Sequence, residues 1–75
     1  MSNYLLLDSR AGIEALKTNG SLSHIHDWDK FILFTGTLKE CCDYANDGTY
    51  GSLCVVADLT GLVRFDLFVN NKWEC

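Results

Sequence analysis

Residues 31–48 read FILFTGTLKECCDYANDG, and this stretch joins an apolar run to the clearest helix start in the chain. The run from Phe31 to Thr35 is apolar at both alternating positions, so we expect a strand that is central or covered on both faces. Thr37-Leu38-Lys39-Glu40 matches the capping box, in which the Thr hydroxyl and the Glu carboxylate each accept an amide proton. The helix that follows ends at Asn46-Asp47-Gly48, and its predicted buried stripe consists of Leu38, Cys41, Cys42 and Ala45.

The part of the chain before this stretch has the same order of signals. Asn3 to Leu7 is a short apolar run that predicts a strand, and Asp8-Ser9 is a helix N-cap signal. The predicted helix covers Arg10 to Thr18, stops at Asn19-Gly20, and buries Ile13 and Leu16 with Ala11 and Ala15 nearby. Ser21 to Lys30 has no clean period, so we expect a loop with one helical turn or a short bridge.

The part after it is typical of hairpins. Leu53 to Leu59 is a β-branched run, and Asp58-Leu59-Thr60-Gly61 suits a type I turn. Leu62 to Val69 alternates apolar and polar residues, which predicts a second, half-exposed strand. Asn70-Asn71 is another turn signal, after which residues 73–75 can pair back as a short edge strand.

Together these elements predict one domain of the α+β class over residues 1–75. The order is β-α-β-α-β-β, and we expect two layers: a mixed or antiparallel sheet of four to five strands, with two short helices on one face. Hydrophobic residues make up 48% of the 75 residues, which is enough for one core and excludes a disordered chain.

The charge pattern excludes one class of partner. Six basic and ten acidic residues give a formal net charge of -4, and the Lys and Arg residues form no cluster. Nucleic-acid binding requires several cations along one groove, so we expect no direct contact with nucleic acid. An acidic surface instead favours a partner with a basic surface.

The start of the chain and its cysteines bear on its compartment. Met1 to Tyr4 has no basic n-region, and no apolar run is long enough to span a membrane, so we expect a cytoplasmic protein without membrane contact. In that compartment Cys41, Cys42, Cys54 and Cys75 are expected to be reduced, with two or three of them buried and Cys75 exposed.

The sequence contains no motif for catalysis or for a cofactor. His24-Ile25-His26-Asp27-Trp28-Asp29 is the densest group of metal-competent side chains, but a catalytic metal needs further ligands. Cys41 and Cys42 are adjacent on a helix, where their side chains diverge by about 100°, so they suit one zinc ion poorly. We therefore expect no metal, no cofactor and no enzymatic activity.

The candidate binding residues are aromatic and acidic. They are Asp27, Trp28, Asp29, Tyr50 and Trp73, since Trp and Tyr often anchor interfaces and carboxylates steer basic partners. The alternative for Trp28 is that its ring closes the small core. Small acidic chains of this kind are frequent among phage and mobile-element accessory proteins, so we expect a non-enzymatic module that inhibits a host defence protein by direct contact.

Two other functions stay open at this point. One is a small-ligand or metal-dependent regulatory domain that uses the loop from His24 to Asp29. The other is a homodimer formed through an exposed edge strand.

Overall fold

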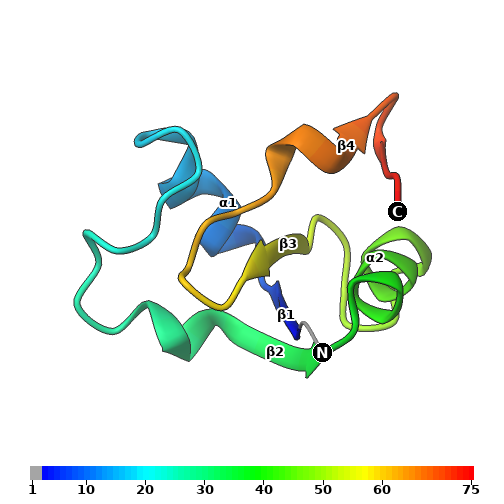
Figure 1. Cartoon of the computed structure of the whole chain (residues 1–75), viewed down its shortest axis with the longest axis horizontal. Coiled ribbons are helices and arrows are strands. Elements are labelled where there is room, and N and C mark those ends of the chain that lie inside the picture. The colour runs from blue at the N-terminus through cyan, green and yellow to red at the C-terminus, as the bar shows by residue number, and fades with distance from the viewer. Residues whose placement is uncertain (1–2) are drawn as a thin grey trace.

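The computed structural model describes residues 3–75 and has an α+β fold with two antiparallel sheets (Figure 1). In the larger sheet β1 (Tyr4–Leu7) lies between β2 (Ile32–Gly36) and β3 (Val55–Asp58). The smaller sheet is a hairpin of β4 (Phe68–Val69) and β5 (Lys72–Trp73). The α+β class is thus confirmed, but the five strands are divided between sheets of three and two strands rather than joined in one.

The central strand is β1, and its three leucines form the middle of the core. Leu6 pairs with Phe34 on one side and with Val56 on the other. Leu5, Leu6 and Leu7 are all buried. Because successive side chains of a strand point to opposite faces, this run shows that both faces of β1 are covered.

The strand β2 lies at the edge of the sheet, so the expectation of a central strand at residues 31–35 was wrong. Leu33 is exposed, and exposure alternates along the strand. Phe31, which is buried, belongs to a short 3-10 helix, η1 (Trp28–Phe31), and this helix is the turn expected within residues 21–30. The apolar run at residues 31–35 thus consists of one residue of η1 and four residues of β2, an edge strand with one face more exposed than the other.

The first helix, α1 (Ser9–Leu16), begins as expected but turns a different face to the core. The Asp8 carboxylate caps it by accepting hydrogen bonds from the amides of Arg10 and Ala11. Its buried residues are Ala11, Gly12 and Ala15, whereas Ile13 and Leu16 are 59% and 70% exposed. The predicted burial of Ile13 and Leu16 was wrong because the helix approaches β3 through its small residues. A Cβ atom on Gly12 would lie 2.9 Å from Cγ1 of Val55.

The second helix, α2 (Leu38–Asp47), confirms the signals at both of its ends. The Thr37 hydroxyl accepts from the Glu40 amide at 3.1 Å, and Glu40 Oε1 accepts from the Thr37 amide at 2.9 Å. Cys41 and Cys42 are buried on its inner face, and Leu38 and Ala45 pack against the core. Gly48 ends the helix with a left-handed φ of 75°.

The long second strand expected at residues 62–69 is absent from the structure. The turn before it is present, since the Gly61 amide donates to the Asp58 carbonyl at 3.1 Å. Bridges then join Ser21 to Leu62 and Ala57 to Val63, after which the chain forms a 3-10 helix, η2 (Phe65–Leu67). Leu53 has a φ of 65°, so the chain before β3 is not extended and offers no partner for residues 65–69.

The C-terminal hairpin forms at the predicted turn and is fastened to α2. Asn70 and Asn71 have φ values of 54° and 63°, which is the conformation that a two-residue type I′ hairpin loop requires. A disulfide joins Cys42 on α2 to Cys75, so the expectation of four reduced cysteines was wrong. Cys75 is exposed and the other three cysteines are buried, as expected. Cys41 and Cys54 are free and buried, and burial raises the pKa of the Cys41 thiol to about 11.

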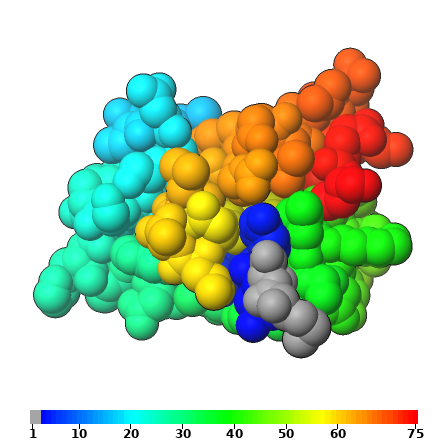
Figure 2. Space-filling view, viewed as in Figure 1, coloured from blue at the N-terminus to red at the C-terminus, as the bar shows by residue number. Residues whose placement is uncertain are grey.

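Two further features complete the arrangement. Figure 2 shows the turn after β3, in yellow, beside the loop before η1, in cyan to teal, and the Leu22 amide donates to the Gly61 carbonyl at 2.8 Å there. None of the helices within residues 3–75 is long and apolar enough to cross a membrane.

Candidate functional site

The acidic loop before β2 is exposed to solvent. Asp27 and Asp29 are both exposed, and Asp27 forms a 3.8 Å ion pair with Lys30. His24 and His26 are exposed on the same loop. In the part of the chain that the structure describes, no group of three His, Cys, Asp or Glu side chains could hold a metal ion.

Trp28 lies under the turn that follows β3. Its ring is half-buried and packs against the core. A Cβ atom on Gly61 would lie 3.1 Å from both Cε2 and Cζ2 of Trp28, so the indole and the Gly61 backbone are in close contact. This position matches the alternative in which Trp28 closes the core.

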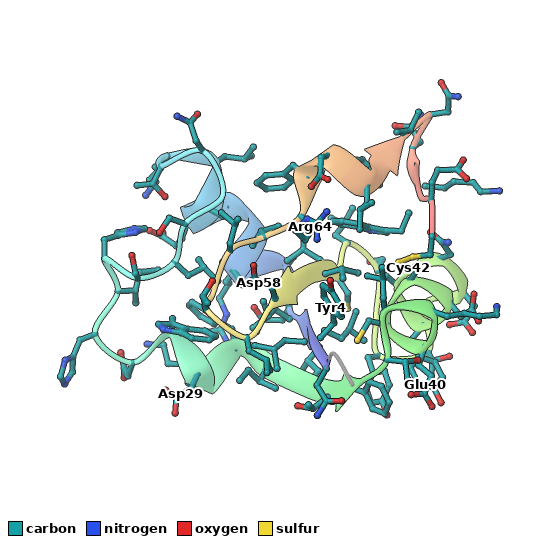
Figure 3. The ribbon with its side chains drawn as sticks, viewed as in Figure 1. Tyr4, Asp29, Glu40, Cys42, Asp58 and Arg64 are labelled. Carbon is teal, nitrogen blue, oxygen red and sulfur yellow. A yellow bond between two sulfur atoms is a disulfide. The ribbon has the colours of Figure 1, made fainter. Side chains whose placement is uncertain are left out.

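The other two aromatic candidates lie away from this loop. Tyr50 follows α2 and forms a cluster with Phe34 and Tyr44, with ring centroids 5.8 and 5.3 Å from its own. Trp73, on β5, is 5% exposed. In Figure 3 Asp29 lies on the left of the view, and Glu40, which is on α2, lies on the right. The structure therefore brings Asp27, Trp28 and Asp29 together and places Tyr50 and Trp73 elsewhere.

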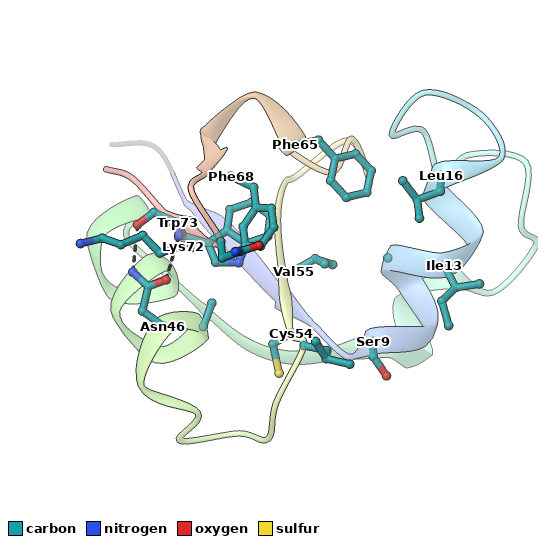
Figure 4. A pocket seen from close by; sticks show the side chains of 14 residues that line it. Ser9, Ile13, Leu16, Asn46, Cys54, Val55, Phe65, Phe68, Lys72 and Trp73 are labelled. Atoms are coloured by element: carbon teal, nitrogen blue, oxygen red, sulfur yellow. Dashed lines mark hydrogen bonds between the residues drawn. The ribbon is translucent and has the colours of Figure 1, made fainter.

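A different surface stands out, and we call it the apolar groove. It is a hollow of about 560 Å³ between α1 on one side and α2 with the β4–β5 hairpin on the other (Figure 4). Its lining is mainly apolar and comes from five segments of the chain: Ser9, Gly12, Ile13, Leu16, Ala45, Asn46, Leu53, Cys54, Val55, Phe65, Phe68, Asn71, Lys72 and Trp73.

Large apolar side chains are exposed along the rim of this groove. Ile13, Leu16, Leu53 and Phe68 are 59%, 70%, 77% and 44% exposed. Single exposed apolar residues are common, but several around one hollow usually mark a binding surface. In Figure 4 Leu16 and Phe65 lie at one end of the groove and Trp73 lies across it from α1.

The groove has a firm wall on the hairpin side. The Asn46 carboxamide donates to the Trp73 carbonyl at 2.9 Å and accepts from the Trp73 amide at 2.8 Å, as the dashed lines in Figure 4 show. The rings of Phe68 and Trp73 pack with their centroids 5.1 Å apart. These contacts and the disulfide fix the hairpin to α2, so the groove is preformed rather than assembled by a ligand.

The chemistry of the lining suits binding. Among the described residues that line the groove, Lys72 alone carries a charge, and no carboxylate or imidazole can serve as a base. The Cys54 thiol donates to the carbonyls of Gly51 and Tyr50, at 3.4 and 3.7 Å. Burial, followed by the nearby Asp8 carboxylate, raises the pKa of this thiol and keeps it protonated at neutral pH.

Sequence reasoning missed the groove, although α1 contains a signal for it. Small residues at Ala11, Gly12 and Ala15 and large apolar residues at Ile13 and Leu16 occupy different sides of one short helix. A helix with this composition has more apolar surface than contact with one strand can bury. The excess apolar side is the one that lines the groove.

Comparison with known proteins gives no further guidance to function. No protein-family model matches this chain, and no curated protein and no solved structure matches it either.

Proposed function

We propose that the chain is a small non-enzymatic protein-binding module whose contact surface is the apolar groove. The observation that supports this most directly is the grouping of Ile13, Leu16, Leu53 and Phe68, four exposed apolar side chains, around one preformed hollow. Burial of such side chains against a partner is the main favourable contribution to association. The lining described above has no acid–base pair that would serve a reaction.

The wider expectations from the sequence stay proposals. They are an intracellular protein that inhibits a host defence protein by direct contact, as phage and mobile-element accessory proteins do, and a second contact through Asp27, Trp28 and Asp29 with a basic partner. In a reducing compartment the Cys42–Cys75 disulfide would be open, and the two Asn46 hydrogen bonds would hold the hairpin on α2 without it. Homodimerisation through an edge strand also stays a proposal. In the described part of the chain, β2 pairs only with β1 and is an edge strand of its sheet, so its outer edge could accept a strand.

A small apolar ligand is the second candidate, and one observation favours it. The groove volume of about 560 Å³ falls in the range of about 300–1,000 Å³ that is usual for ligand pockets. In this case the regulatory domain suggested by the sequence would bind its ligand in the groove and not at the loop formed by residues 24–29. A protein partner is preferred because the most exposed side chains stand on the rim, where the side chains of a partner protein reach them and an enclosed ligand does not.

The test compares two exposed leucines. Leu16 is 70% exposed on the groove, and Leu59 is 58% exposed on the turn after β3 and does not line it. Tagged wild-type protein, Leu16→Gln and Leu59→Gln would be used to capture partners, with bound amounts measured by quantitative mass spectrometry. Because burying a leucine contributes about 1.5–3 kcal/mol, we expect Leu16→Gln to weaken capture by about 10-fold or more and Leu59→Gln to leave it unchanged.

Thermal melts of both variants accompany the capture experiment. Both substitutions replace exposed side chains, so both proteins should melt close to the wild type. A folded Leu16→Gln variant that captures the same partner at the wild-type level would contradict the proposed function.

A further inference from the structure

Resting on the proposed function, we infer that the occupant of the apolar groove is an amphipathic α-helix of a partner protein, with a carboxylate beside its apolar stripe. The carboxylate would pair with Lys72 on the groove rim. This assigns the groove a partner of the opposite charge type from the basic partner that the overall acidity of the chain suggests.

Lys72 differs from every other cation in the chain. The structure describes all six Lys and Arg residues, and five of them form an ion pair with a carboxylate: Arg10 with Asp8, Lys17 with Glu14, Lys30 with Asp27, Lys39 with Asp43, and Arg64 with Asp66. Within residues 3–75, Lys72 is the one cation without such a partner. It is exposed, and it lines the groove.

No carboxylate that the structure describes lines the groove, and the Asp8 carboxylate near Cys54 is paired with Arg10. The polar lining residues of the groove are Ser9, Asn46, Asn71 and Lys72. The carboxamide of Asn46 is occupied by the Trp73 backbone. A ligand carboxylate would therefore find one ammonium group and neutral polar groups at the rim. A ligand cation would meet only the ammonium as a charged group.

The walls favour a helix over an added strand. The groove is bounded by α1 and α2, whose backbone groups are bonded within the helices, and by the β4–β5 hairpin. On the hairpin, the Asn46 carboxamide takes both the amide and the carbonyl of Trp73, and the Phe68 amide donates to the Phe65 carbonyl. Recognition along these walls therefore depends on side-chain packing. An added strand would instead need a free strand edge along the groove. A helix has a diameter of about 10–12 Å and a rise of about 1.5 Å per residue, so about 12 residues cover about 18 Å.

The probes are two synthetic 14-residue peptides with the same leucine stripe at positions i, i+3, i+4 and i+7. One peptide has Glu and the other Lys beside the stripe, with Ala and Gln elsewhere. Their dissociation constants would be measured by fluorescence anisotropy at low salt and in 0.5 M NaCl. Amide shifts in ¹⁵N-labelled protein would locate the contact.

A charge-reversed pair of variants isolates the contribution of Lys72. Lys72→Glu and Lys39→Glu change the net charge equally, but Lys39 lies on α2 and does not line the groove. We expect both peptides to shift the resonances of Leu16, Phe68 and Trp73. The dissociation constant of the acidic peptide divided by that of the basic peptide should rise by about threefold or more in Lys72→Glu. The same ratio should stay at the wild-type value in Lys39→Glu. High salt should remove this difference.

Each other outcome has a defined meaning. If both peptides occupy the groove and Lys72→Glu changes the ratio no more than Lys39→Glu does, the acidic helix is wrong and the proposed binding function stands. If neither peptide shifts the groove resonances at millimolar concentration, the inference that a partner helix occupies the groove is wrong. Self-association that Leu16→Gln abolishes would identify a second copy as the occupant and overturn the inference. Loss of capture in the Leu16→Gln experiment tests the proposed function separately.

Discussion

Asn46 is the residue through which the hairpin wall of the apolar groove can be weakened with the smallest change. Its carboxamide makes two hydrogen bonds to the backbone of Trp73, at 2.9 and 2.8 Å, across a sequence separation of 27. A hydrogen bond contributes about 0.5–1.5 kcal/mol net, so removing both should cost about 1–3 kcal/mol. Alanine favours the helix over asparagine by about 0.5 kcal/mol, which leaves about 0.5–2.5 kcal/mol of destabilisation for Asn46→Ala.

Asn46→Asp gives a graded second measurement. The carboxylate keeps an acceptor for the Trp73 amide but has no donor for the Trp73 carbonyl, and the two oxygens then repel each other. The new charge also lies near the C-terminus of α2, which is unfavourable by about 0.3–1 kcal/mol. We therefore expect the order of stability to be wild type, Asn46→Ala, Asn46→Asp.

The assay is urea denaturation under oxidising conditions, with Asp43→Ala as the matched control on α2. Asp43 is exposed and pairs only with Lys39, so its replacement should change the free energy of unfolding by less than about 0.5 kcal/mol. The Trp73 indole resonance should also shift in both Asn46 variants. Equal midpoints for the wild type and both Asn46 variants would refute the argument that Asn46 holds the hairpin on α2.

The remaining predictions concern the groove floor, the disulfide and acid stability. Gly12→Val should lower the free energy of unfolding by about 1–3 kcal/mol in a urea titration, because the added Cβ would meet Val55 at 2.9 Å, and an unchanged midpoint would exclude this close approach. Cys75→Ser should cost about 3–4 kcal/mol under oxidising conditions, since its disulfide closes a loop with a separation of 33; a midpoint equal to that of the wild type would contradict the pairing. Burial alone would raise the pKa of the Asp58 carboxyl, but hydrogen bonds from Thr60 and Leu62 and the nearby Arg64 lower it overall. The stability that results is present above the ordinary pKa of about 4 and is lost as the pH falls through the lowered value, so Asp58→Asn should flatten the acid side of the stability profile. Parallel slopes for the two proteins would show that Asp58 does not contribute.

Elements fixed by local chemistry were predictable from the sequence. The capping box at Thr37 and Glu40 requires only residues three apart, and the left-handed stop at Gly48 follows from the lack of a side chain. The same is true of Asn70-Asn71, whose positive φ values define the hairpin turn. These signals act within one turn of the chain, so neighbouring residues determine the outcome.

Features that depend on distant contacts could not be predicted in this way. The spacing of Ile13 and Leu16 gives no sign that Gly12 lets α1 approach Val55, and this approach turns both large side chains outward. The candidate site was missed mainly for the same reason, because five separate segments of the chain form its lining, and the excess apolar surface of α1 was its local signal. Pairing of Cys42 with Cys75 likewise requires the hairpin to return to α2.

The position of β1 at the centre of the sheet has a consequence for how the protein is made. Both neighbours of this strand come later in the chain, and Tyr4 pairs with Gly36 on one side and with Asp58 on the other. A ribosome must therefore synthesise the chain as far as Asp58 before the sheet can close. Contacts between residues so far apart in sequence raise the contact order, which slows folding relative to a helical bundle of the same length. During synthesis, the leucines of β1 would stay without their second strand until most of the chain had emerged, and in this interval the nascent protein would be most open to aggregation or to capture by chaperones.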